Sequence, residues 1–294
     1  MTLDGPMSVI LPAAGKGRRF AADGVASASK IEFELAGRAA FLHAIDRFLE
    51  RGDVGQIILA VDPDGYDTFE QRWGEQLAFM GVELMPGGRA ERWETVQLAL
   101  DRVLAEARYV AVHDAARPLA SGALIERVVG TLQEAELATP AVAGVVPGLA
   151  VADSLKRVEP AEPPRPADRA DDILGFVGEA DPGDAGVAPA VQRITEAVSR
   201  VSLVGVQTPQ VFRADVLREA YRTLGSQTAD GITDDAGLVQ RLGHPVLVVE
   251  GEPINFKITR PDDARLAEAW LSQGRAKAEQ ADTVRELFGD DDDD

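Results

Sequence analysis

The sequence predicts an α/β protein built on a mostly parallel β-sheet, and two observations lead to this prediction. Short apolar runs that are typical of buried strands alternate with segments whose apolar residues recur at helical spacing. Loops rich in small and charged residues follow three of these runs. Because strands that are joined through helices lie parallel with right-handed crossovers, the three loops are expected to meet at one edge of the sheet.

The first half of the chain supplies the alternation on which this prediction depends. The first expected helix places Phe41 and Ile45 on one face, and a later one does the same with Val96, Leu100 and Val103. In chain order, the predicted elements are a strand at 9–11, a helix at 41–49, a strand at 57–61, a helix at 66–80, a strand at 82–85, a helix at 91–107 and a strand at 109–112.

The pattern changes after residue 139. Strands are predicted at 140–147 and 153–158 without an intervening helix, which favours a β-arm that projects from the sheet. Residues 158–197 contain six prolines and indicate an insert without a packed core, with a compact lid as the alternative. The remaining predicted elements are a strand at 201–206, helices at 214–224 and 234–242, strands at 246–249 and 256–259, and a helix from 261 to about 277.

The elements above predict one domain over residues 1–271, because 294 residues can bury a full core. Its arm covers about 139–200 and contains the insert at 158–197. Residues 272–294 are expected to form the end of the last helix and an acidic tail.

Composition and charge exclude several classes of protein. The net charge of −19 is concentrated in the five terminal aspartates and in the insert, which has nine acidic and three basic residues. No basic stripe is present, so nucleic acid is not an expected partner. The absence of cysteine excludes a thiolate nucleophile and a cysteine metal site. With no signal-peptide pattern and no long apolar run, a cytoplasmic protein without membrane contact is expected.

The loop after the first strand reads Pro12-Ala13-Ala14-Gly15-Lys16-Gly17-Arg18-Arg19. Small residues let backbone N–H groups approach a phosphate, and the basic side chains add positive charge. A tight turn with exposed arginines is the alternative. Lys30, shortly downstream, is either a second cation for the same pocket or a surface residue.

Two further loops carry compatible chemistry. The loop after the third strand begins with Gly87 and Gly88, and Thr95 offers a hydroxyl one turn into the next helix. The loop after the fourth strand contains Asp114 and Arg117. A carboxylate at the end of a buried strand is costly unless it is paired or binds a metal, and its hard oxygens suit Mg²⁺. Asp114 is thus a candidate Mg²⁺ ligand and Arg117 a candidate phosphate ligand, with an internal ion pair between them as the alternative.

The three loops together are more informative than any one of them. Ligands of an open parallel sheet bind outside the carboxyl ends of its strands, where all three loops are expected to lie. The sequence therefore predicts a site for a phosphate-bearing ligand at this edge.

In these loops the chain resembles the cytidylyltransferases that activate 2-C-methyl-D-erythritol 4-phosphate, and the similarity covers nearly all of 8–157 and 198–271. Residues 12–19 match the family's nucleotide loop, and 112–118 match its metal and substrate segment. Further matching positions are 153–156, Arg200, 207–210, 233–236 and 255–261.

The resemblance implies a Rossmann-like, mostly parallel fold of the nucleotidyltransferase type with a projecting β-arm. The implied reaction transfers CMP from CTP to the polyol phosphate and releases pyrophosphate, with Mg²⁺ as cofactor. A homodimer formed through the arm is also implied. The attacking phosphate is already anionic, with a second pKa of about 6, so no general base is required.

The resemblance also implies a role for each matching residue. The catalytic residues would be Arg19, Lys30 and Lys257. The nucleotide would be bound by Pro12, Ala13, Ala14, Gly15, Gly17, Gly88, Thr95 and Ala115. The acceptor would be bound by Arg117, Thr208 and Thr233, and by Ser154 and Arg200 of the partner's arm, while Asp114 would bind the metal.

Two alternatives remain open at this point. A cytidylyltransferase for a pentitol phosphate, such as ribitol 5-phosphate, would share the nucleotide loops and differ in the acceptor pocket. A catalytically silent nucleotide-binding protein on the same fold would release no pyrophosphate.

Overall fold

The computed structural model describes residues 6–15, 31–161, 191–224 and 234–288, with side chains of the last helix described as far as Gly274. The chain divides into two compact units. One contains Met1–Leu149 and Val206–Asp294, and the other contains Ala150–Gly205.

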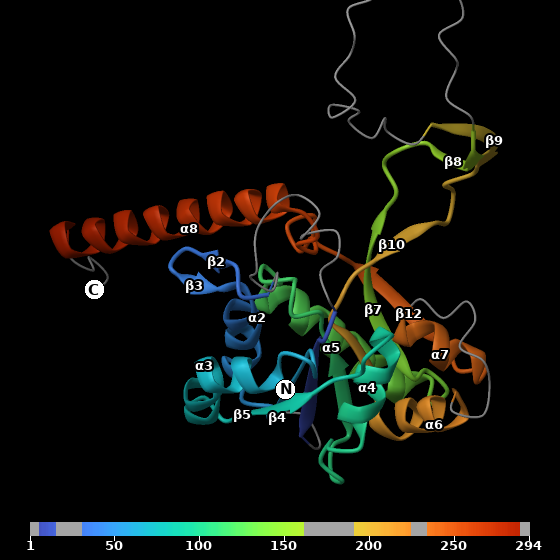
Figure 1. Cartoon of the computed structure of the whole chain (residues 1–294), viewed down its shortest axis with the longest axis horizontal. Coiled ribbons are helices and arrows are strands. Elements are labelled where there is room, and N and C mark those ends of the chain that lie inside the picture. The colour runs from blue at the N-terminus through green and yellow to red at the C-terminus, as the bar shows by residue number, and fades with distance from the viewer. Residues whose placement is uncertain (1–5, 16–30, 162–190, 225–233, 289–294) are drawn as a thin grey trace, which may run out of the picture. The chain divides into compact units, whose positions relative to one another are not determined.

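The first unit is built on a mixed sheet (Figure 1). Strand β1 (Met7–Ala13) pairs in parallel with β4 (Val54–Val61) on one side and with β6 (Tyr109–Val112) on the other, and β4 pairs in parallel with β5 (Val82–Pro86). These four strands follow the predicted alternation of strand and helix. Their parallel arrangement confirms the predicted mostly parallel α/β fold.

The other half of this sheet contains a strand that runs against both of its neighbours. Strand β11 (Gln210–Arg213) runs antiparallel to both β6 and β7 (Gly144–Ala150), and β12 (Val246–Glu250) pairs in parallel with β7. The strand order is β10-β7-β11-β6-β1-β4-β5, where β10 is Val204–Val206, and β12 lies off this path beside β7. No strand was predicted at the position of β11.

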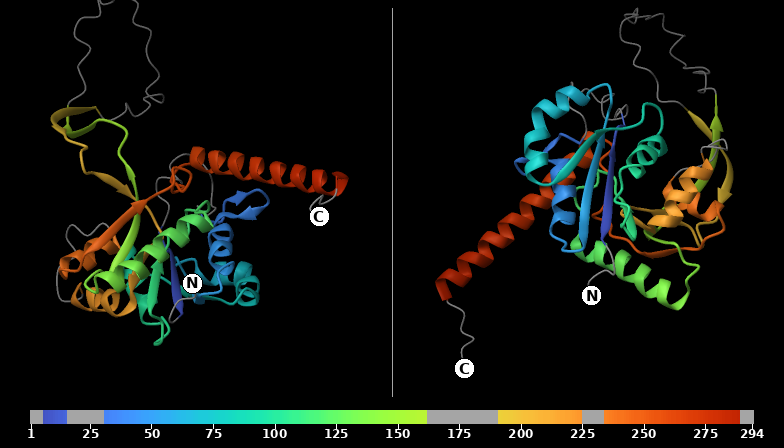
Figure 2. Two further views of the ribbon diagram at one scale, coloured as in Figure 1. Left: turned by 180° about the vertical axis from the view of Figure 1, so that it is seen from behind. Right: turned by 90° about the horizontal axis from the view of Figure 1, so that it is seen from below.

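Helices cover both faces of the sheet (Figure 2). Alternate residues of β1 point to opposite sides, so that Val9 and Leu11 join one core cluster and Ile10 joins the other. The first cluster contains side chains of α2 (Ala40–Leu49), α3 (Tyr66–Phe79) and α5 (Gly122–Ala138). The second contains side chains of α4 (Arg92–Leu100), α6 (Ala214–Leu224) and α7 (Asp235–Arg241). Because β1 is buried on both faces, the loop that follows it starts from a rigid position.

The last helix packs on a short hairpin. Helix α8 (Pro261–Phe288) contributes Ala264 and Ala267 to a third cluster, beside Leu35 of the hairpin β2 (Glu34–Leu35) and β3 (Arg38–Ala39). The carboxylate of Glu268 also accepts a hydrogen bond from the backbone N–H of Ala36. The helix is longer than the predicted 261–277.

Two further predicted elements differ from the structure, and one helix was not predicted. Helix α4 ends at Leu100, not at residue 107, because the chain turns there and still buries Val103 against the same core. Residues 256–259 form no strand; they follow an irregular path, and Ile258 donates a backbone hydrogen bond to Ala116. Helix α5 was not predicted, although Ser121 caps it by accepting a hydrogen bond from the backbone N–H of Leu124 at 2.9 Å.

The second unit contains an antiparallel ribbon of β8 (Leu155–Pro160) and β9 (Gln192–Val198). Glu196 pairs with Arg157 at 3.0 Å, and Glu159 pairs with Arg193. The ends of the predicted insert at 158–197 thus belong to this ribbon, while residues 162–190 lie outside the described part of the chain. Across the described residues, no helix combines the length and apolar character that a bilayer crossing requires.

Candidate active site

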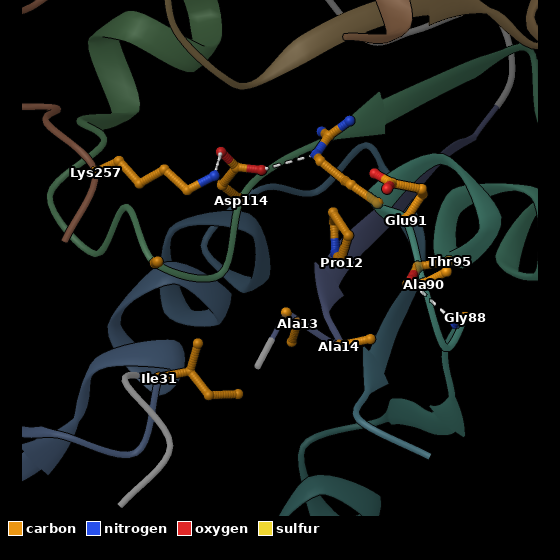
Figure 3. Close-up of a pocket in the computed structure, with 13 residues that line it drawn as sticks. Pro12, Ala13, Ala14, Ile31, Gly88, Ala90, Glu91, Thr95, Asp114 and Lys257 are labelled. Carbon is orange, nitrogen blue, oxygen red and sulfur yellow. Dashed lines mark hydrogen bonds and ion pairs between the residues drawn. The ribbon is translucent and has the colours of Figure 1, made fainter. Parts of the chain in front are cut away.

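A pocket lies beyond the carboxyl ends of β1, β5 and β6 (Figure 3). The structure brings residues from all three predicted loops into its lining. Residues 12–15 come from the first loop, Gly88 and the start of α4 from the second, and Asp114 and Ala116 from the third. Lys257, from a segment much later in the chain, completes one side.

Glycine is required where the second loop approaches the first. The backbone N–H of Gly88 donates to Oγ1 of Thr95 at 3.0 Å, which joins the loop to the first turn of α4 (Figure 3). A Cβ atom on Gly87 would lie 2.7 Å from Cβ of Ala14, and one on Gly88 would lie 2.4 Å from Cβ of Glu94. The second loop can therefore pack this closely against the first loop and against α4 only because glycine has no Cβ atom.

Gly88→Ala is expected to lower the free energy of unfolding by about 1–3 kcal/mol, because the added methyl group overpacks the loop against α4. Urea unfolding measures the effect. Gly122→Ala is the matched control, since a Cβ there meets nothing within 4 Å. Equal stability of the two variants would show that the loop accommodates the methyl group.

Asp114 lies at the centre of a cluster of charges. Its Oδ1 accepts a hydrogen bond from Nε of Arg92 at 3.1 Å, and its Oδ2 accepts one from Nζ of Lys257 at 2.8 Å. Nε of Arg117 lies 3.7 Å from the same Oδ2. Burial alone would raise the pKa of Asp114, but Arg92, Lys257 and Arg117 hold it well below its usual range. The carboxylate is therefore ionised, and the cations around it leave an excess of positive charge beside the pocket.

His113 supports this carboxylate from its buried side. Its Nε2 lies 3.1 Å from the carbonyl oxygen of Arg117, which can only accept, so Nε2 carries the proton. Its Nδ1 then accepts from the hydroxyl of Thr208 at 3.1 Å, and that hydroxyl accepts the backbone N–H of Asp114 at 3.0 Å. Complete burial lowers the pKa of His113 to about 4. The imidazole is thus neutral, and both of its ring nitrogens are hydrogen-bonded.

The buried His113 should make the stability of the protein depend on pH. Its pKa falls from 6.5 to about 4 on folding, so the unfolded chain binds the additional proton between these values. The stability that the neutral imidazole contributes is complete above pH 6.5 and is lost as the pH falls toward 4. At pH 5 the loss is about 2 kcal/mol. Urea unfolding at pH 7.5 and 5 measures it, and His113→Asn, whose amide oxygen replaces the Nδ1 acceptor, should lack this component.

The segment that carries Lys257 is fixed by the third loop and by the chain that leads into β11. The carbonyl oxygen of Asn255 accepts a hydrogen bond from Nη1 of Arg117 at 2.6 Å. The side-chain amide of Asn255 donates to the carbonyl oxygen of Thr208 at 2.8 Å. These bonds, together with that from Ile258 to Ala116, hold the segment on both sides of Lys257.

With this geometry in place, comparison with known proteins decides the family. The family model described as 2-C-methyl-D-erythritol 4-phosphate cytidylyltransferase matches residues 7–170 and 185–273. The chain belongs to this cytidylyltransferase family. The match is interrupted only at 171–184, so the ribbon β8–β9 lies within the family pattern.

Individual members of the cytidylyltransferase family are similar over most of their length. The enzyme of Rhodopirellula baltica is 35% identical over 92% of this chain and 97% of its own. That of Symbiobacterium thermophilum is 37% identical over 91% of this chain and 94% of its own. The crystal structure of the Thermus thermophilus enzyme superposes with a TM-score of 0.62 at 30% identity, and it covers 92% of this chain and 100% of its own. The resemblance found in the sequence is confirmed.

The residues that the family resemblance implied fall into four groups in the structure. Those that line the pocket are Pro12, Ala13, Ala14, Gly15, Gly88, Thr95, Asp114 and Lys257. Those that lie outside the described residues are Gly17, Arg19, Lys30 and Thr233. Those that lie in the second unit are Ser154 and Arg200, where Arg200 donates to the carbonyl oxygen of Ala152.

Three implied residues lie behind the pocket. Ala115 is buried in the first core cluster, and its neighbour Ala116 faces the pocket instead. Thr208 is buried between His113 and Asp114. The Arg117 side chain is 12% exposed and bonds the backbone at Asn255. In the described part of the chain, none of the three contributes to the pocket lining.

Sequence reasoning missed two charged residues of this site. Arg92 lines the pocket and received no role from the sequence. Asp235, which bonds Arg92 at 2.7 Å, lies within the matching segment 233–236 but received no role. The available signal was the pair of aspartates, Asp234 and Asp235, of which only the first is accounted for by capping α7.

Proposed function

We propose that the protein transfers CMP from CTP to 2-C-methyl-D-erythritol 4-phosphate, which yields 4-diphosphocytidyl-2-C-methylerythritol and pyrophosphate. The observation that carries the proposal is the family match over nearly the whole chain. The pocket fits this reaction, because it combines glycine-dependent loops with Arg92 and Lys257 beside one ionised carboxylate.

The chemistry requires charge stabilisation more than proton transfer. An oxygen of the acceptor's phosphate attacks the α-phosphorus of CTP, and the bond from that phosphorus to the bridging oxygen of pyrophosphate breaks. The attacking oxygen is already anionic, so the neutral, buried His113 is not needed as a base. Lys257 and Arg92 lower the repulsion between the two anions and stabilise the charge that develops on the transferred group.

Mg²⁺ is part of the proposal. Among the described residues, no group of three acidic or histidine side chains could hold an ion without a ligand. Asp114 alone fits a cation that arrives with the triphosphate, because Mg²⁺ in such sites keeps its waters and takes one or two carboxylates plus phosphate oxygens. When bound, the ion would neutralise the departing pyrophosphate.

A pyrophosphate-release assay over a panel of nucleotides and acceptors tests the proposal. CTP with 2-C-methyl-D-erythritol 4-phosphate should give the highest kcat/KM, and omission of Mg²⁺ should abolish turnover. A preference for ribitol 5-phosphate would establish the pentitol-phosphate alternative. No pyrophosphate from any pair, with CTP still bound in calorimetry, would establish a silent nucleotide-binding protein.

We further propose that the protein is a cytoplasmic homodimer in which the ribbon β8–β9 contacts a second copy, with Ser154 and Arg200 serving the partner's site. The support is the apolar surface of the second unit, where Ile194 is 60% exposed and Val201 is 79% exposed.

Ile194→Asp is expected to convert the dimer to a monomer, because it places a charge in the apolar contact. Light scattering after gel filtration measures the mass. Phe79→Asp, in the first unit at 94% exposure, is the control that should leave the mass unchanged. An unchanged dimer in Ile194→Asp would contradict contact through the ribbon.

A further inference from the structure

Arg92 is held between two carboxylates that come from distant parts of the sequence. Its Nε donates to Oδ1 of Asp114 at 3.1 Å, and its Nη1 donates to Oδ2 of Asp235 at 2.7 Å. Burial alone would lower the pKa of Arg92, but the attraction of Asp235 and then of Asp114 raises it. The guanidinium is therefore a fixed cation whose position depends on both partners.

Asp235 has no access to solvent and does not line the pocket. Its second carboxylate oxygen accepts a hydrogen bond from the hydroxyl of Tyr221, which is itself buried. Burial and the neighbouring Asp235 raise the pKa of Tyr221 well above 10, so the hydroxyl keeps its proton and remains the donor. Asp235 is thus fixed at both oxygens, by α6 on one side and by Arg92 of α4 on the other.

The two ends of Asp114 are consequently held by different elements. Arg92 holds Oδ1 from α4, and Lys257 holds Oδ2 from the segment before α8. A carboxylate bonded at both oxygens cannot rotate freely about its terminal bond. Loss of Arg92's position would leave Asp114 bound mainly to Lys257, on one side of the pocket.

Stability alone does not account for this arrangement. Burial of charged groups costs desolvation energy, and packed apolar side chains of similar volume stabilise a core at least as well as a buried ion pair. The Asp235 side chain is fully buried, yet its only described charged partner is a residue of the pocket. Orientation of that pocket residue is a role that an apolar pair could not fill.

We infer that Asp235 and Tyr221 are positioning residues for the transfer reaction, which act by fixing the guanidinium of Arg92, and through it the carboxylate of Asp114, beside the place where the substrate phosphates bind. The inference rests on the proposed function. Neither residue touches the pocket, and both reach it through the same guanidinium group.

Asp235→Asn keeps the shape of the side chain and removes its charge. We expect this substitution to lower kcat by at least about 10-fold, because loss of a residue that orients a direct ligand commonly has an effect of this size. The KM for CTP should change less. Tyr221→Phe removes only the hydroxyl. It should lower kcat less than Asp235→Asn does, and it should destabilise the fold less. The matched control is Asp53→Asn, which breaks the pairing of Asp53 with Arg51, at 12% and 14% side-chain exposure. Asp53 directly precedes β4 and does not line the pocket, which lies at the opposite, carboxyl ends of the parallel strands. The control variant should be destabilised without loss of kcat.

A double-mutant cycle separates positioning from a general loss of structure. If Asp235 acts through Arg92, the double variant of Arg92→Met and Asp235→Asn should have the kcat of Arg92→Met alone. The double variant of Arg92→Met and Tyr221→Phe should also have the kcat of Arg92→Met alone. Multiplied losses in the double variants would overturn the inference. So would a kcat for Asp235→Asn and Tyr221→Phe equal to that of the unaltered protein.

The same assay distinguishes failure of the inference from failure of the proposed function. Absence of pyrophosphate release by the unaltered protein would contradict the proposed function. If the unaltered protein releases pyrophosphate normally, then an unchanged kcat in the single variants, or losses of kcat that multiply in the double variants, would contradict only the positioning role.

Discussion

Lys257→Met is expected to lower kcat by about 10²-fold or more, because one preorganised charged donor at a reacting phosphate commonly contributes this much. The substitution keeps the length of the side chain and removes the ammonium group that lies 2.8 Å from Oδ2 of Asp114. Steady-state pyrophosphate release at saturating CTP and acceptor measures the effect.

The control for this experiment removes a cation from the surface. Arg265, in α8, pairs with Asp262 and is 79% exposed at its side chain, so Arg265→Met should keep normal turnover. If Lys257→Met retained kcat within about threefold of the control, Lys257 would have no catalytic role, since such a change is below the contribution of one donor.

Asp114→Asn is expected to lower the free energy of unfolding by about 3 kcal/mol or more and to abolish most activity. An amide would direct its N–H₂ group at Arg92 or Lys257, both of which can only donate, and would leave the cations without their shared anion. Urea unfolding near neutral pH measures the loss of stability. Asp46→Asn, which breaks an ion pair with Arg38 at 33% and 37% side-chain exposure, should cost less than about 1 kcal/mol.

The pH dependence gives this prediction a second readout. Because folding depresses the pKa of Asp114, its contribution is complete above the ordinary value of 3.8 and is lost as the pH falls through and below that value. The gap in stability between the unaltered protein and Asp114→Asn should therefore narrow below about pH 4. A gap that is constant with pH would indicate that shape, rather than charge, stabilises Asp114 in the fold.

The sequence predicted the parts of the fold that local patterns encode. Apolar runs located β1, β4, β5 and β6, and the loops after three of them meet in one pocket, as the rule for open sheets requires. The predicted end of α4 was wrong, because Val103 continues the helical spacing of buried residues after the helix has ended. Periodicity reports which residues are buried, and a compact turn can bury them as well as a helix can.

The charged site was less predictable because its partners are distant in sequence. Arg92 and Asp235 are separated by 143 residues, and no local pattern indicates that they pair. Ala115 and Ala116 show the same limit at short range, because a shift of one residue decides which of two identical side chains faces the pocket. Such assignments depend on the exact path of the backbone after β6.

Because β11 runs antiparallel to β6, residues that precede a strand can also lie at the edge of the sheet where the pocket is found. In a wholly parallel sheet, only residues that come after a strand arrive at the edge where β1 and β6 terminate. An antiparallel strand starts at that edge. The residues just before β11, including Thr208, therefore lie beside the carboxyl end of β6. The backbone of Asp114 is consequently bonded to a segment that enters the sheet rather than leaves it, and two opposite chain directions converge on this one residue.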